Sequence, residues 1–229
     1  MNPKLFIALD ALSEREEETF GMAEQLVNVE GQFGFKLNLD YLLSPGRSIQ
    51  ARLQDIQSLG RPVFADLKMW NGSRTMASIA ENLIAQGIDF FNVYALADEL
   101  LSQTIKLVRD RDTKVLGLTV LSHFDERYCR EHFRRSLPET VRHLSEVAFK
   151  SGCDGIILPG TTLQAVDDLD IIKVVPGIRP AWYQDRRHKE TVKPREAMEK
   201  GADILVCGSP ITKAANPVQA LRKILKEIG

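Results

Sequence analysis

A small group of charged side chains falls where an apolar strand would be expected to exclude charge. Lys36 interrupts the segment GFKLNL, and a lysine in a buried strand is costly unless a carboxylate or a ligand compensates its charge. Asp66 and Lys68 lie two residues apart, so strand periodicity points both side chains to the same side. One aspartate and two lysines can form a compact array of alternating charge, and such interacting groups are common at functional sites. The alternative is a structural ion pair without a chemical role.

The segments KVVPGIRP and ILVCGSPI offer a second kind of chemistry, the binding of an anion. Gly177 and Gly208 let the backbone approach a ligand closely, and Arg179 supplies a cation beside the first of them. Residues 186–189 add a run of basic side chains, for which a solvated loop is the alternative. These segments predict a phosphate site.

Such side chains need a scaffold that brings them together, and the apolar pattern of the chain indicates one. Eight short, nearly continuous apolar runs recur at fairly regular intervals, as expected for strands buried on both faces of a parallel sheet. They cover residues 5–9, 33–37, 62–65, 90–93, 115–121, 155–158, 171–175 and 204–207.

Amphipathic segments separate these runs, among them residues 14–29, 73–87, 137–152, 193–201 and 216–229. Several predicted helices end in a glycine typical of a helix C-terminus, namely Gly60, Gly87, Gly152 and Gly201. The alternation of strand and helix, with right-handed crossovers, predicts an α/β fold, a single-domain (β/α)₈ TIM barrel over residues 1–229. An open doubly wound sheet is the alternative, but no G-x-G-x-x-G follows the first run.

A barrel of this kind carries its chemistry at the C-terminal ends of the strands, and the loops after strands seven and eight commonly hold a phosphate. The residues expected at that face are, in chain order, Asp10, Lys36, Asp66, Lys68, Asn92, Thr119, Ser122, Pro176, Gly177, Arg179, Gly208 and Ser209.

The composition excludes several other classes of protein. With 30 basic and 31 acidic residues, the chain lacks the positive charge of a general nucleic-acid binder. The first residues turn acidic too soon for a signal peptide, and no apolar run approaches the roughly 18 residues of a membrane span. We therefore expect a cytoplasmic protein without a nucleic-acid or membrane partner.

Cysteine and histidine placement gives no metal site. Cys129, Cys153 and Cys207 are odd in number and form no C-x-x-C pair, and Cys153 and Cys207 are expected to pack as small buried side chains. The four histidines show no spacing typical of metal ligands. No metal and no cofactor are expected.

Through essentially its whole length the sequence resembles the orotidine 5′-phosphate decarboxylase family. The matching segments are IALD (7–10), GFKLNL (34–39), FADLK (64–68), NGSRT (71–75), FNVYA (91–95), GLTVLS (117–122), VVPGIRP (174–180) and GADILVCGSPIT (201–212). One such motif would be weak evidence, whereas this series, in order and at barrel spacing, is strong evidence for the superfamily.

The resemblance implies a cofactor-free decarboxylation of orotidine monophosphate to uridine monophosphate by a homodimer. The family's Lys-Asp-Lys-Asp array, whose last aspartate comes from the neighbouring subunit, is matched at its first three positions by Lys36, Asp66 and Lys68. Lys68 would donate the proton to C6 as CO₂ leaves. Asp66 would lie against the departing carboxylate, and Lys36 would orient Asp66 and meet the ribose.

The resemblance also implies contacts with a nucleotide monophosphate substrate. Asp10 and Thr75 match residues at the ribose, and Ser122 matches the serine that binds the pyrimidine amide. The backbone around Gly177 and Gly208 would face the phosphate, whose binding energy helps to drive closure and catalysis.

Two departures from the family pattern stand out. The motif D-x-K-x-x-D ends here in Asn71, and the last-strand Gly-Arg-Pro, whose arginine clamps the phosphate, ends in Ser209-Pro210. These changes predict a weakened or redirected activity. They also predict that phosphate recognition has moved to the cations after the seventh strand, namely Arg179, Arg186, Arg187, His188 and Lys189.

Two other functions stay open at this point. One is a related barrel that acts on a β-keto or hexulose sugar phosphate with a divalent metal, and the other is a non-catalytic binder of a nucleotide monophosphate. A homodimer with active sites at the subunit interface is expected in the catalytic case, with Met69 and Trp70 beside Asn71 as interface residues.

Overall fold

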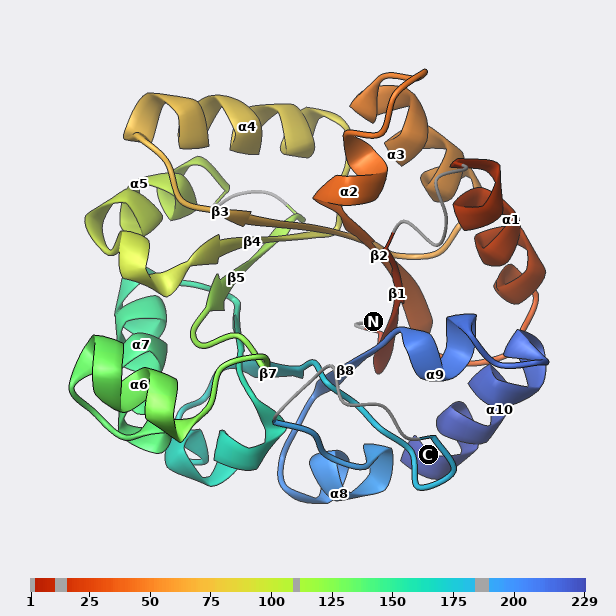
Figure 1. Ribbon diagram of the computed structural model, residues 1–229. Coiled ribbons are helices and arrows are strands. Elements are labelled where there is room, and N and C mark those ends of the chain that lie inside the picture. The colour runs from red at the N-terminus through yellow and green to blue at the C-terminus, as the bar shows by residue number, and fades with distance from the viewer. Residues whose placement is uncertain (1–2, 11–15, 109–111, 184–189) are drawn as a thin grey trace.

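The protein forms a closed ring of parallel strands in a computed structural model, which describes residues 3–10, 16–108, 112–183 and 190–229 (Figure 1). The strands are β1 (Leu5–Leu9), β2 (Phe33–Asn38), β3 (Val63–Met69), β4 (Phe90–Tyr94), β5 (Lys114–Leu118), β6 (Gly155–Ile157), β7 (Ile172–Val175) and β8 (Ile204–Cys207). Each strand pairs with the next, and β8 closes on β1 through the pair Leu5–Leu205. The predicted TIM barrel is confirmed, and the open sheet is excluded.

Helices surround the barrel on its outside (Figure 1). They are α1 (Glu16–Val27), α2 (Leu39–Leu42), α3 (Ile49–Ser58), α4 (Ser73–Ala85), α5 (Glu99–Val108), α6 (Glu126–Phe133), α7 (Leu137–Ser151), α8 (Pro194–Glu199), α9 (Ser209–Thr212) and α10 (Pro217–Ile228), with 3₁₀ segments η1 (Ala95–Ala97) and η2 (Gly160–Val166). The glycines predicted to end helices all have positive φ: Gly60 at 72°, Gly87 at 68°, Gly152 at 88° and Gly201 at 92°. This left-handed conformation is the usual helix stop, because glycine adopts it without steric cost.

Two apolar layers follow from the alternation of side chains along the strands. Leu5, Ile7 and Leu9 pack outward with residues of the helices, whereas Phe6 points inward, where its ring lies 5.4 Å from that of Phe64 and 5.2 Å from that of Phe90. Gly34 provides the room for Phe6, since a Cβ there would lie 2.8 Å from Phe6 Cε1 and 2.4 Å from a backbone oxygen. The barrel centre is therefore a packed core that supports the site above it.

Two strands, β3 and β5, end more than one residue away from the end of their predicted apolar runs, and both differences lie at the site. β3 continues to Met69, four residues beyond Ala65, where its predicted run ends. Its pairing with β4 passes from Ala65–Phe91 directly to Met69–Val93, so four steps along β3 match two along β4. β5 ends at Leu118, and the last two residues of its predicted run, Val120 and Leu121, lie in the loop behind it, where they line a pocket.

The three cysteines are buried free thiols. Burial raises the pKa of Cys153 and of Cys207 to about 12, so both are unreactive at neutral pH. The expected role of these two as small packing residues is confirmed. In the part of the chain that the structure describes, no helix has the length and apolar content that crossing a bilayer requires.

Candidate active site

A pocket of about 270 Å³ opens at the C-terminal ends of the strands, the face on which barrels of this type carry chemistry. Every strand, or the loop behind it, contributes to the lining. The lining residues are Ala8, Asp10, Lys36, Asn38, Phe64, Asp66, Lys68, Asn92, Leu118, Val120, Leu121, Ser122, His123, Ile157, Pro176, Gly177, Arg179, Val206, Gly208 and Ser209.

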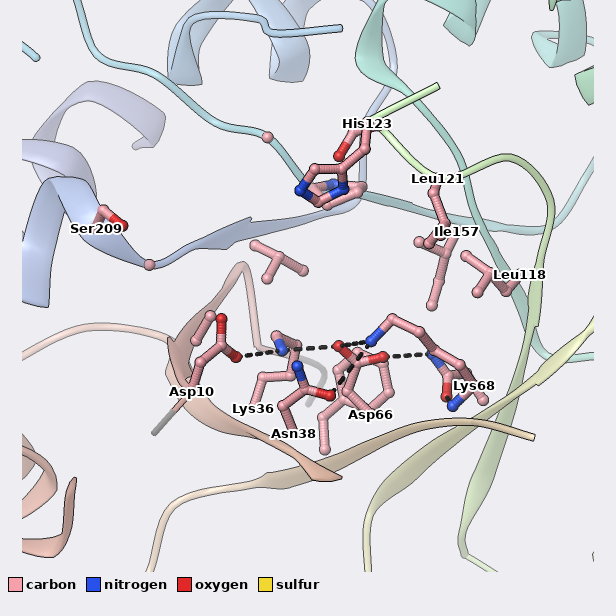
Figure 2. A pocket seen from close by; sticks show the side chains of 18 of the residues that line it. Asp10, Lys36, Asn38, Asp66, Lys68, Leu118, Leu121, His123, Ile157 and Ser209 are labelled. Atoms are coloured by element: carbon pink, nitrogen blue, oxygen red, sulfur yellow. Dashed lines mark hydrogen bonds and ion pairs between the residues drawn. The ribbon is translucent and has the colours of Figure 1, made fainter. Parts of the chain in front are cut away.

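Alternating charges occupy one side of this pocket (Figure 2). Lys36 Nζ lies 3.0 Å from Asp10 Oδ1 and 2.7 Å from Asp66 Oδ2. Lys68 Nζ lies 2.8 Å from the same Asp66 oxygen. The side chains of Lys36 and Asp66 are only 8% and 10% exposed, whereas that of Asp10 is 50% exposed at the mouth. The array therefore runs from the solvent-facing Asp10 to Lys68 inside the pocket.

Mutual attraction keeps the buried members of this array ionised. Burial raises the pKa of the Asp66 carboxyl, but the ammonium groups of Lys36 and Lys68 lower it by more, so it lies well below its usual range. Burial lowers the pKa of Lys36, but Asp66 and Asp10 raise it by more, so it lies above its usual range. Both groups are charged at neutral pH, which is how the apolar strand GFKLNL accommodates a lysine.

Two asparagines complete the polar side of the pocket. Asn92 Nδ2 donates to Asp66 Oδ1 at 2.7 Å, and Asn92 Oδ1 accepts the backbone N–H of Lys68 at 2.7 Å. Asn38 Oδ1 accepts from Lys68 Nζ at 3.5 Å and from the backbone N–H of Leu39 at 2.9 Å. Lys68 itself has a φ of 51°, a left-handed conformation that is rare for a residue other than glycine.

An apolar wall faces the charges. Leu118, Leu121 and Ile157 lie across the pocket from the array (Figure 2). Apolar surroundings lower the local dielectric, which strengthens the action of Lys68 and Asp66 on a ligand held between the two sides. The arrangement suits a substrate that carries an apolar ring face and a charged reacting group.

The segments predicted to bind a phosphate also line the pocket. Pro176, Gly177 and Arg179 from the loop after β7 and Gly208 and Ser209 after β8 all belong to the lining. Arg179 Nη1 donates to the oxygen of Ile178 at 2.9 Å, and its guanidinium carbon lies 5.7 Å from the centre of the Tyr183 ring. The other predicted phosphate cations, Arg186, Arg187, His188 and Lys189, lie outside the described residues.

Of the two residues predicted at the site after β5, only one lines the pocket. Ser122 is buried and lines the pocket. Thr119 is buried as well, but its hydroxyl donates to the oxygen of Ile157 at 2.8 Å, and the residue does not belong to the lining. Thr119 therefore holds β5 against β6 in this structure.

Asn71 and Thr75 lie outside the pocket, on the exposed rim behind β3. Asn71 Oδ1 accepts the backbone N–H of Gly72 at 2.8 Å, and Thr75 belongs to the first turn of α4. Met69, expected at a subunit interface, is 6% exposed and packs in the core, so that part of the prediction is wrong. Its neighbour Trp70 is 59% exposed.

Asn38, Asn92 and His123 also line the pocket. The sequence placed Asn92 at this face but gave it no role, and it did not single out Asn38 or His123 as site residues. Two of them carried a usable signal. Asn38 follows Lys36 by two residues in one strand, so it shares the same side, and Asn92 interrupts the apolar run FFNVY as Lys36 interrupts its own. His123 lies in a loop, where no periodicity predicts orientation.

Over residues 3–10, 16–108, 112–183 and 190–229, no group of three or more His, Cys, Asp or Glu side chains gathers in a way that could hold a metal ion. Both carboxylates of the pocket, Asp10 and Asp66, are paired with Lys36.

Comparison with known proteins gives consistent results. The sequence model of the orotidine 5′-phosphate decarboxylase / HUMPS family matches residues 3–224. An orotidine 5′-phosphate decarboxylase of Paramagnetospirillum magneticum is 32% identical over 100% of this chain and 99% of its own. One from Carboxydothermus hydrogenoformans is 29% identical over 100% of this chain and 97% of its own.

Solved structures agree in fold. The crystal structure of orotidine 5′-phosphate decarboxylase from Lactobacillus acidophilus superimposes with a TM-score of 0.81 at 25% identity, over 100% of both chains. An uncharacterized conserved protein from Geobacillus kaustophilus gives a TM-score of 0.80 at 22% identity, which concerns the fold alone. With the family model spanning nearly the whole chain, this protein belongs to the orotidine 5′-phosphate decarboxylase / HUMPS family.

Proposed function

We propose that the protein is a carboxy-lyase that converts orotidine 5′-phosphate to uridine 5′-monophosphate in pyrimidine biosynthesis, without a metal or cofactor. Family membership supports the class of reaction. The observation that carries the proposal is the position of the Lys68 ammonium group, 2.8 Å from Asp66 in a pocket with an apolar wall.

Lys68 and Asp66 divide the chemistry between them. The bond between C6 and the carboxylate breaks, CO₂ leaves, and the electron pair stays on C6. The positive charge of Lys68 stabilises this carbanion, and its ammonium group then protonates C6, so that solvent must restore the proton on Lys68. The negative charge of Asp66 lies against the departing carboxylate and favours its conversion into neutral CO₂.

The remaining pocket residues bind the parts of the nucleotide that do not react. Asp10 and Lys36 meet the ribose, Ser122 binds the pyrimidine amide, and the backbone at Gly177 and Gly208 faces the phosphate with Arg179. Binding energy from these remote contacts favours catalysis when it is realised only at the transition state.

A homodimer accounts for the residues on the rim. Asn71 and Thr75 are exposed in the single chain, next to Trp70, whose side chain is 59% exposed. A second copy packed against this rim would cover Trp70 and bring Asn71 to the partner's pocket, where the family carries its fourth catalytic position.

Consumption of orotidine 5′-phosphate, followed by ultraviolet absorbance in the presence of a chelator, tests the proposal. We expect turnover that the chelator does not change. Turnover of a hexulose or β-keto sugar phosphate that depends on a divalent metal would instead establish the related metal-assisted reaction. Binding of uridine monophosphate with no turnover would establish a non-catalytic nucleotide binder.

A further inference from the structure

We infer that Asn92 is a positioning residue for this reaction, one that fixes the plane of the Asp66 carboxylate and the backbone of Lys68 at the same time. The inference rests on the proposed function, because it concerns the two side chains that would carry the chemistry. Asn92 acts through Asp66 and Lys68 by direct hydrogen bonds to both.

Asn92 is a fully buried amide in the middle of an apolar strand. It is 0% exposed, and its neighbours in β4, Phe91 and Val93, belong to the outer apolar layer. A buried amide is costly unless its donor and acceptor both find partners. Here Nδ2 donates to Asp66 and Oδ1 accepts from Lys68. A flipped amide would face the carboxylate with oxygen and the N–H with a donor, so only this orientation satisfies both partners.

The contact with Lys68 occurs where β3 departs from regular pairing. Between the pairs Ala65–Phe91 and Met69–Val93, β3 contains two residues more than β4, since four steps match two. Within this bulge Lys68 has a φ of 51°, a conformation that β-strands do not otherwise use. Asn92 Oδ1 accepts the Lys68 N–H inside the bulge, and thereby takes the place of a backbone acceptor on β4.

The contact of Asn92 with Asp66 fixes the orientation of the carboxylate, because it holds the oxygen that the lysines do not. Oδ2 receives the ammonium groups of Lys36 and Lys68 at 2.7 and 2.8 Å, and Oδ1 receives Asn92 Nδ2 at 2.7 Å. Without Asn92, the contacts that the described side chains make with the carboxylate are those on Oδ2, about which it can turn. Lys68 would also be free to leave its left-handed conformation, which would displace its Nζ from the reacting carbon.

Asn92→Ala removes both hydrogen bonds. We expect kcat to fall by about 10²-fold, as when a reacting group is misplaced by about 1 Å, while KM changes by less than about threefold. Thr140→Val is the matched control, because it also deletes a hydrogen bond of a buried side chain, from Thr140 to Ser136 O at 2.8 Å, but in α7, away from the pocket. It should lower the melting temperature and leave kcat and KM unchanged.

Asn92→Asp distinguishes a positioning role from a merely structural one through the pH dependence of kcat. The variant keeps the shape of the side chain but sets a second carboxylate against Asp66, and only its protonated form can still donate to Asp66. The other ionisable groups that interact with Asp66 are Lys68 from β3, Lys36 from β2 and Tyr94 of β4. The partner of Asn92 on β5 is the apolar Leu116. Lowering the pH from 9 to 6 protonates the new carboxyl and removes its repulsion of Asp66. The ratio of variant to wild-type kcat should therefore rise at least tenfold over this range, on the order of the activity that the repulsion removes.

A folded Asn92→Ala protein with kcat within about threefold of wild type would overturn the inference. So would a ratio for Asn92→Asp that does not depend on pH, which decides the matter if Asn92→Ala does not fold. Crystal structures of both variants separate this inference from the proposed function. If wild type shows no decarboxylation, the proposed function fails, whereas an unchanged Asp66 plane and Lys68 φ in the variants would show that Asn92 positions neither.

Discussion

Lys68 is the side chain on which the proposed reaction depends most directly. We expect Lys68→Ala to abolish turnover, by more than the roughly 10²–10⁴-fold that a single general acid contributes, because Asp66 then faces the substrate carboxylate with less compensation. The fold should persist, since Asp66 keeps its contacts with Lys36 and Asn92. Steady-state kinetics and circular dichroism measure the two effects.

Lys114→Ala is the matched control for this variant. It also removes a lysine paired with an aspartate, Asp154 at 3.7 Å, but at the first residue of β5, the end of the strand opposite to the pocket. Its activity should equal that of wild type. Retention of most activity by Lys68→Ala would mean that another group donates the proton.

The low pKa of Asp66 implies that the free energy of unfolding depends on pH in acid. The pKa of this carboxyl is lowered in the folded state from its ordinary value of 3.8, so its stabilisation is complete above that pH and is lost as the pH falls below it. Asp66→Asn breaks a buried ion pair and should cost about 3–5 kcal/mol at neutral pH. Chemical denaturation should show this difference from wild type constant between pH 5 and 7 and shrinking in acid. A difference that stays constant below the ordinary carboxyl pKa would contradict the charged state assigned to Asp66.

Asn71 is the position at which the family carries a second aspartate. An amide is nearly isosteric with a carboxylate and accepts hydrogen bonds, but it supplies no negative charge to attract the Lys68 ammonium group and fix its position toward C6. We expect Asn71→Asp to raise the single-turnover rate with orotidine 5′-phosphate and to bind the nucleotide slightly more weakly, because an added anion repels an anionic substrate. Asn71→Ala, which removes the amide without adding charge, should give no gain. No gain from the aspartate either would mean that the site serves another substrate or no longer catalyses.

At the scale of elements, the strands could be predicted and the bulge in β3 could not. Each strand is buried on both faces, so its apolar run is visible in the sequence, and the predicted fold is confirmed. The path of β3 after Ala65 depends instead on a side chain of another strand, Asn92, which no local pattern of β3 reveals. The loop after β5 shows the same limit, since Val120 and Leu121 read as strand but turn into the pocket.

The residues of the candidate site likewise fall into those that the sequence could place and those that it could not. Asp66 and Lys68 could be placed together because strand periodicity and the barrel rule both act on residues within elements. Thr119 could not be separated from Ser122, because which of the two faces the pocket depends on where β5 ends. Asn71 and Thr75 matched a family motif in the sequence, but in the single chain they lie on the rim, where only a second subunit would complete their role.

The loop after β7 is the element to which phosphate binding is assigned. With Ser209 where the family has an arginine, we expect Arg179→Gln to raise KM for a phosphorylated substrate about tenfold or more, the value of a hydrogen bond to a charged group. It should spare an unphosphorylated analogue. The double variant Arg186→Gln/Arg187→Gln tests residues outside the described part of the chain in the same assay. Arg222→Gln, exposed on α10, is the control, and equal effects on both substrates would contradict a phosphate site.

At the scale of the whole molecule, the exposed rim beside β3 and β4 has the character of an interface with a partner. Trp70 is 59% exposed with its ring centre 6.3 Å from that of Tyr94, and Leu96 after β4 is 36% exposed. Large apolar side chains gathered at one edge are typical of an interface. A second copy of the chain is the partner that would also bring Asn71 toward a pocket.

We therefore expect a homodimer at micromolar concentration in sedimentation velocity. Trp70→Lys should shift the protein toward monomer, because a charge cannot be buried in an apolar contact without compensation. Its kcat should fall with dissociation and recover as the protein concentration is raised, since in the proposed homodimer Asn71 would act across the interface. Phe149→Lys changes another exposed aromatic residue, 46% exposed on α7, and should alter neither property. A wild-type protein that stays monomeric and fully active would show that each pocket is complete within one chain, and that Asn71 and Thr75 have lost the role their motif has in the family.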